Sequence, residues 1–222
     1  MLTLVLTRHG ATDRSDPEQY LGQRIEAHLT EEGKAAARAL GERLSSVDFD
    51  LVMSSPLERA METAHLIRPH DPVHADPRLL EADYGSWEGL TVRDIEARWP
   101  VERANYEADP GANAAPGGES GLAVAERAGL VLDEVADWGE TVWEGDERAK
   151  ESRVLLVGHS TLNRVLLADA LGVPLRDYRR RFRQDWANLT VLRFDRRDGG
   201  GWQLLVCNDV AHLKGIRGAT WD

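Results

Sequence analysis

The chain has 222 residues, of which 42% are hydrophobic and 29% are charged, and its formal net charge is -11 at pH 7. This composition is typical of a globular protein and excludes a fibrous or wholly disordered chain. The acidic balance argues against a general nucleic-acid-binding or anionic-membrane surface, because such surfaces need a basic footprint. Any affinity for an anion must therefore be local.

A single domain over residues 1–222 is predicted, because the chain can bury a substantial core and no Gly/Ser-rich or Pro-rich stretch divides it cleanly. The first apolar run is too short for a secretory signal, and no stretch approaches membrane-spanning length. The lone Cys207 follows an apolar run, which favours a buried structural thiol in a reducing compartment. We expect a cytoplasmic protein without nucleic-acid or membrane partners.

The first predicted element is a strand over Leu2 to Leu6, whose nearly continuous apolar character is typical of a central strand in a parallel sheet. A helix follows over Glu31 to Ser46, with Thr30 as its N-cap and apolar residues at helical spacing. A second strand is expected over Phe49 to Met53. Strands alternating with amphipathic helices indicate an α/β fold.

The next helix is predicted to begin near Pro56 and to end at about Ile67, which places Arg59 in its first turns. Helix amino termini attract anions through their free N–H groups, so an arginine there adds positive charge to an anion site. The following stretch from Asp71 to Gly89 is predicted as a loop that carries Glu81. Residues from about 90 to 118, rich in proline and glycine, are expected to form a cap or insert loop that selects the substrate.

The remaining elements are a helix over Glu119 to Trp138, a strand over Val154 to Val157, a helix over Thr161 to Leu171, and a closing hairpin of residues 188–194 and 202–207. Two of the predicted strands end in the same way. Arg8-His9-Gly10 follows the first strand, and Gly158-His159-Ser160 follows the strand at 154–157. Because ligands bind beyond the carboxyl ends of strands in open α/β sheets, we expect one pocket with two imidazoles that suits a phosphate.

Four motifs resemble those of the histidine phosphatase superfamily, also called phosphoglycerate mutase-like, in their order and spacing: TRHGAT, SSPLERAMETA, EADYGSWEG and VGHS. Any one of them alone would be weak, but together they span most of the chain. The resemblance implies a three-layer αβα sandwich whose sheet is mostly parallel with an antiparallel edge.

The resemblance also implies the roles of the site residues. His9 is the nucleophile that forms a phosphohistidine, and Glu81 protonates the leaving alkoxide and then activates water. Arg8 and Arg59 hold the equatorial oxygens of the phosphoryl group, and His159 would act, if protonated, as a further donor to them, so no metal ion or other cofactor is required.

Two further residues belong to the expected substrate-binding set, which is Arg8, Thr12, Ser15, Arg59 and His159. The hydroxyl of Thr12 could contact the phosphate or only support the turn. Ser15 stands where family members often have asparagine in the pattern RHGxTxxN, which leaves one auxiliary contact in doubt.

Around Glu81 the chain resembles the phosphatase branch, because the mutase branch typically has basic residues there, which hold a second anionic group. The leading hypothesis is a phosphomonoesterase that acts on a small phosphorylated metabolite. One alternative is a 2,3-bisphosphoglycerate-dependent phosphoglycerate mutase. Another is a catalytically weak phospho-ligand-binding module.

Less specific interpretations also exist. Arg59 could merely pair with Glu58 or Glu62 on a solvated helix. Asp83 and Glu88 are rivals of Glu81 for the acid role. The basic run Arg179 to Arg181 is typical of a solvated helix face, although it could contact another subunit, so a homo-oligomer is an alternative.

Overall fold

The computed structural model describes residues 1–144, 151–195 and 200–216. Its sheet has the strand order β3-β2-β4-β1-β5-β6. The parallel strands are β1 (Leu2–Arg8), β2 (Leu51–Ser54), β3 (Val73–Ala75) and β4 (Ser152–Gly158). The strands β5 (Leu189–Asp195) and β6 (Gly201–Asp209) are antiparallel and form one edge. The prediction of a mostly parallel sheet with an antiparallel edge is confirmed.

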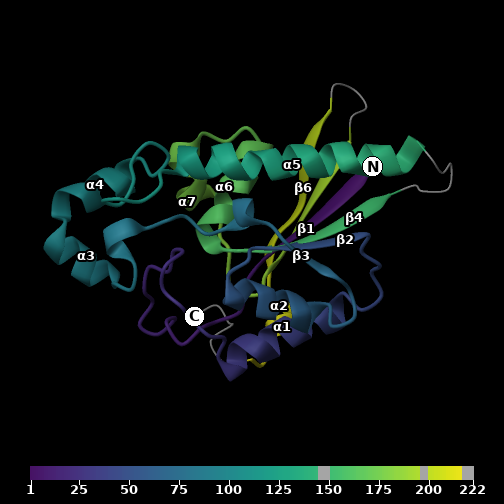
Figure 1. Ribbon diagram of the computed structural model, residues 1–222, viewed down its shortest axis with the longest axis horizontal. Coiled ribbons are helices and arrows are strands. Elements are labelled where there is room, and N and C mark those ends of the chain that lie inside the picture. The colour runs from purple at the N-terminus through teal and green to yellow at the C-terminus, as the bar shows by residue number, and fades with distance from the viewer. Residues whose placement is uncertain (145–150, 196–199, 217–222) are drawn as a thin grey trace.

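Helices cover both faces of this sheet (Figure 1). The helices α1 (Glu31–Arg43) and α2 (Glu58–Ile67) cover one face, and α5 (Gly121–Glu144) and α6 (Ser160–Ala170) cover the other. Side chains alternate between the faces along β1, so Leu4 and Leu6 join the core under α5 and α6 while Val5 joins the core under α1 and α2. This arrangement is the expected αβα sandwich.

The segment at 90–118 is not the loop that its prolines and glycines predicted. It contains α3 (Val92–Arg98) and α4 (Pro100–Ala108), which lie beyond the end of the sheet in Figure 1. Thr91 and Asp94 form a capping box at the start of α3. Pro100 occupies the first turn of α4, where its missing N–H needs no partner, so it begins a helix rather than interrupting one.

The expectation of a buried Cys207 is wrong, because its side chain is exposed. The reason is that β6 is an outer strand, bonded on one side to β5, and its apolar residues are only partly covered, with Leu205 44% exposed. The short helix α7 (Tyr178–Arg181) precedes this hairpin. Within the described ranges, no helix is long and apolar enough to cross a membrane.

Candidate active site

The two predicted histidines meet because their strands are neighbours in register. Arg8 pairs with Gly158 across β1 and β4, and the backbone N–H of His9 donates to the Gly158 carbonyl at 3.0 Å. The imidazole centroids of His9 and His159 lie 5.2 Å apart, in an edge-on arrangement. Gly10 is required at this turn, since a Cβ there would lie 2.5 Å from the Gly33 carbonyl oxygen.

The buried imidazole of His9 is held as a nucleophile would need to be. Its Nδ1 lies 2.7 Å from the carbonyl oxygen of Gly10, which can only accept, so Nδ1 carries the proton and Nε2 carries the lone pair. Burial, followed by the charges of Arg59 and Arg8, lowers the pKa of His9 well below 6.5. The ring is therefore neutral at physiological pH.

Two guanidinium groups flank this imidazole. Arg8 donates from Nη1 to the Gln184 carbonyl at 3.1 Å and lies over the Trp186 ring at 5.2 Å. Arg59 is only 2% exposed and donates from Nη2 to the Gly22 carbonyl at 2.7 Å. Burial lowers the pKa of Arg59 to about 10, so it remains charged at neutral pH.

The interpretation of Arg59 as a solvated surface residue is wrong. In the described part of the chain, Glu58 pairs with His28 and Glu62 pairs with Lys34, while Arg59 turns inward to the site. The second residue of α2 thus presents its guanidinium beside His9, as expected for an anion site at a helix amino terminus.

His159 completes the group from the N-cap position of α6. It is fully buried, and burial, followed by the charge of Arg59, lowers its pKa well below 6.5. The imidazole is therefore neutral in the free protein, so the protonated form considered from the sequence is not the form of the free protein. A neutral ring still has one N–H to donate to an oxygen.

Several buried nitrogens of this group have no hydrogen-bond partner among the described residues. They are Nε of Arg8, Nε of Arg59 and both ring nitrogens of His159. Buried polar groups are normally satisfied, so convergent unpaired nitrogens indicate a place where a ligand supplies the acceptors. A compact anion rich in oxygen would offer acceptors to the N–H groups among these nitrogens.

The carboxylate of Glu81 lies at the amino terminus of α6, next to His159. It is buried and accepts from the backbone N–H groups of Thr161 at 3.0 Å and Leu162 at 2.9 Å. It also accepts from the N–H of Ala82 at 2.9 Å. One helix terminus therefore places both the second imidazole and the proposed acid.

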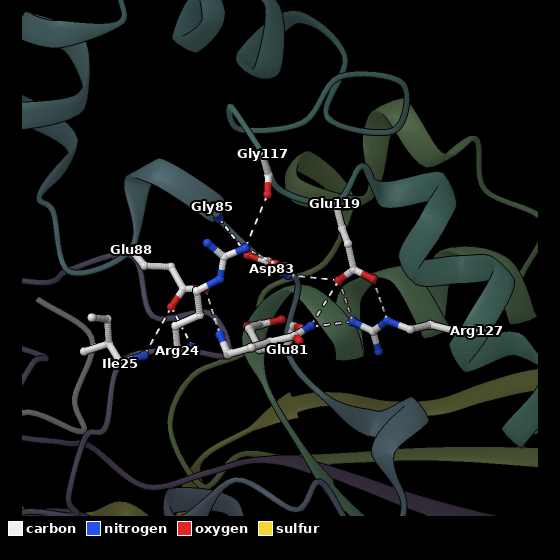
Figure 2. A network of polar contacts seen from close by, with 10 residues as sticks. Arg24, Ile25, Glu81, Asp83, Gly85, Glu88, Gly117, Glu119 and Arg127 are labelled. Carbon is white, nitrogen blue, oxygen red and sulfur yellow. Dashed lines mark hydrogen bonds and ion pairs between the residues drawn. The ribbon is translucent and has the colours of Figure 1, made fainter.

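A polar network holds the loop of Glu81 in place (Figure 2). Arg127 donates to the Glu81 carbonyl at 3.0 Å and pairs with Glu119, which also accepts from the Asp83 N–H. Asp83 itself pairs with Arg24 at 2.7 Å and accepts from the N–H of Gly85. Asp83 is therefore engaged in the loop and is a poor rival for the acid role.

Glu88, the other rival, holds the neighbouring loop. Its carboxylate accepts from the backbone N–H groups of Gln23 at 2.9 Å, Arg24 at 2.8 Å and Ile25 at 3.2 Å. In Figure 2 it lies on the far side of Arg24 from Arg127. Gly22, which precedes Gln23, is the acceptor for Arg59, so this loop connects the Arg59 guanidinium with the Glu81 loop.

Thr12 and Ser15 both support the turn after His9. The Ser15 hydroxyl accepts from the backbone N–H of Thr12 at 2.9 Å, and the Thr12 hydroxyl accepts from the N–H of Arg14 at 3.3 Å. A phosphate contact by either hydroxyl stays a prediction.

Two arginines beside the site were missed from the sequence. Arg164 and Arg179 line a cavity of about 280 Å³ that opens beside Arg8. Arg179 belongs to the run that was expected to be a solvated face, an expectation that is wrong for this residue. A signal for Arg164 did exist, since it follows Thr161 by three residues and so lies on the same face of α6.

Comparison with known proteins agrees with this geometry. The chain is 35% identical over 182 residues to glucosyl-3-phosphoglycerate phosphatase of Mycolicibacterium vanbaalenii, covering 79% of this chain and 76% of that one. It is 32% identical over 183 residues to a 2,3-bisphosphoglycerate-dependent phosphoglycerate mutase of Brucella ovis, covering 74% and 79%. The solved structure of a mycobacterial glucosyl-3-phosphoglycerate phosphatase with VO3 superposes with a TM-score of 0.79 and 34% identity, covering 93% and 98%.

A profile of a whole family matches as well. The profile described as histidine phosphatase superfamily (branch 1) covers residues 4–210, which include every residue of the site described above. The chain belongs to the histidine phosphatase superfamily, branch 1.

Proposed function

We propose that the protein is a phosphomonoesterase that hydrolyses a small phosphorylated metabolite through a phosphohistidine on His9, without a metal ion or other cofactor. The observation that carries this proposal is a neutral, buried imidazole with its Nε2 lone pair available between the buried guanidinium of Arg59 and the partly buried guanidinium of Arg8. The phosphatases among its relatives support the same activity.

In the first step, Nε2 of His9 attacks phosphorus in line with the ester oxygen. The N–P bond forms as the P–O bond to the alcohol breaks, and Glu81 gives a proton to the departing oxygen. Arg8, Arg59 and the N–H of His159 bind the three equatorial oxygens, where the guanidinium charges stabilise the transition state.

In the second step, water replaces the alcohol. The Glu81 carboxylate takes a proton from the water as its oxygen attacks phosphorus, and the electron pair of the N–P bond returns to His9. Inorganic phosphate leaves, and both residues regain their starting protonation states. The single acid/base group therefore serves both halves of the reaction.

The wider organisation is part of the same proposal. Residues 1–222 form one cytoplasmic domain, and the segment 90–118, with α3 and α4, acts as a cap over the substrate. Thr12 and Ser15 support the phosphate-binding turn.

Hydrolysis of an aryl phosphate by the purified protein, with and without a chelator, tests the proposal. Replacement of His9 by alanine should reduce kcat/KM by at least about 10³-fold, because the covalent route is lost. His65→Ala is the matched control, since His65 is exposed. Full activity in His9→Ala, or loss of wild-type activity with chelator, would contradict the proposal.

The mutase among the relatives makes isomerisation the second candidate. A mutase would interconvert phosphoglycerates faster than it hydrolyses them when 2,3-bisphosphoglycerate is supplied. A weak binding module would hold phosphate esters with measurable affinity and no turnover. We expect hydrolysis to exceed isomerisation, because Ala82 and Asp83 follow Glu81 where the mutase branch has basic residues.

A further inference from the structure

The cavity beside the phosphate site is lined by three arginines. Arg8 takes part in both places, so the cavity lies where the alcohol portion of a bound phosphate ester must extend. Tyr20, Tyr84 and Val92 supply apolar wall, and the volume of about 280 Å³ suits a small metabolite. The names of the relatives described above refer to different reactions, so membership of the family does not determine the substrate of this chain. The residues that line this cavity must select it.

Arg164 reaches this cavity from α6. Its Nε is buried and has no hydrogen-bond partner among the described residues. Burial, followed by the charge of Arg8, lowers the pKa of Arg164, although the neighbouring Tyr84 and Glu81 act in the opposite direction. A buried donor without a partner is costly, and an anionic ligand that accepts its hydrogen bond recovers that free energy.

Arg179 reaches the same cavity from α7. It pairs with Glu107 at 3.0 Å and lies 5.1 Å from the centre of the Tyr106 ring. Glu107 is half exposed and pairs with Arg103 as well, so one carboxylate serves two guanidinium groups. Among these three side chains, positive charge therefore exceeds negative charge.

Opposing charge in the cavity is weak. Glu18 is the acidic residue of the lining, but its side chain is 69% exposed and lies 3.5 Å from Arg8. Solvent screening reduces the influence of such a group on the partly buried arginines. The lining of this cavity is therefore positive, although the net charge of the chain is -11.

We propose that Arg164 and Arg179 form a subsite for a second anionic group, so that the substrate is a phosphomonoester whose alcohol itself carries a carboxylate or a second phosphate. Guanidinium groups offer paired N–H donors that match the oxygens of either anion. The proposal rests on the phosphomonoesterase function above and adds its substrate class. It also assigns the second anion to α6 and α7 rather than to the loop around Glu81.

Matched esters test this subsite. The carboxylate arm compares 3-phosphoglycerate with glycerol 3-phosphate, and the phosphate arm compares propanediol bisphosphate with propanediol monophosphate. In at least one arm the charged ester should have a kcat/KM higher by on the order of 10- to 100-fold, the effect of a charge-assisted hydrogen bond. The arm that shows the preference identifies the anion.

Arg164→Gln should abolish this preference while leaving nearly unchanged the hydrolysis of an aryl phosphate whose aryl group carries no charge. Arg164→Lys should restore part of the preference. Arg176→Gln is the matched control, because Arg176 is exposed and its ion pair with Asp177 is long, at 3.9 Å. Binding of the same esters to His9→Ala, with and without Arg164→Gln, gives a readout that does not need turnover.

Equal kcat/KM values within both pairs for the wild-type protein would overturn the subsite. A uniform loss on every substrate in Arg164→Gln would do the same, since it would indicate a general structural role. Failure of the phosphomonoesterase function is distinguishable, because the aryl phosphate would then not be hydrolysed even by wild type.

Discussion

At the scale of single residues, the site depends on keeping an imidazole neutral beside two positive charges. The burial of His9 and its bond to the Gly10 carbonyl achieve this together, since one removes the proton from Nε2 and the other fixes the proton on Nδ1. The same burial acts on His159. The two neutral histidines therefore affect stability as well as chemistry.

The pH dependence of unfolding tests these lowered pKa values. In the unfolded chain both histidines titrate near 6.5, whereas in the folded protein they stay neutral well below that pH. Below pH 6.5 the unfolded state therefore binds more protons, and the free energy of unfolding should fall as the pH falls. The slope is roughly 1 kcal/mol per histidine for each pH unit, until the folded-state pKa is reached.

Melting temperatures between pH 7.5 and 5.5 measure this slope above the range where most carboxylates titrate. The double variant His9→Gln/His159→Gln should show a shallower decline, with a residual slope because burial also lowers the pKa of His212. An unchanged slope in the double variant would mean that these imidazoles are not held neutral.

At the scale of elements, the amino terminus of α6 and two loops position the reacting groups. The first turn of α6 holds the Glu81 carboxylate, and Glu88 fixes the loop whose Gly22 carbonyl orients Arg59. Glu81 is thus expected to transfer a proton, whereas Glu88 is expected to act through the position of other residues. The two glutamates should give different kinetic signatures.

Leaving-group dependence separates these roles. Glu81→Gln should lose most activity on alkyl phosphates, whose alkoxides need a proton, and least on aryl phosphates. Glu88→Gln should lower both by a similar factor, because it loosens the loop rather than removing the acid. Glu26→Gln is the control, since Glu26 is exposed. Equal losses on both ester classes in Glu81→Gln would refute its role as the acid.

At the scale of the whole molecule, the sheet explains why much of the site could be predicted. A buried parallel strand is recognisable by its apolar run, and its carboxyl end must lie at the ligand-binding edge, so Arg8, His9 and His159 were found from sequence. The neighbouring positions of β1 and β4, which set the distance between the two imidazoles, follow from a long-range pairing.

Other features depend on tertiary contacts that no local pattern contains. From the sequence alone, Pro100 is interpreted as a helix breaker, because the start of α4 is not known. Cys207 is interpreted as buried, because the outer position of β6 in the sheet is not known. Arg164 and Arg179 resemble ordinary surface arginines along the chain. Only the packing of α6 and α7 beside Arg8 brings them into one cavity.

The central claim is that His9 carries the phosphoryl group during turnover. Rapid quenching of the protein with a ³²P-labelled phosphate ester, followed by peptide mapping, tests it most directly. We predict acid-labile, base-stable label on the peptide that contains His9 and no such label in His9→Ala. Equal labelling of the His9→Ala protein, or turnover of the wild type with no labelled histidine under single-turnover conditions, would contradict the account.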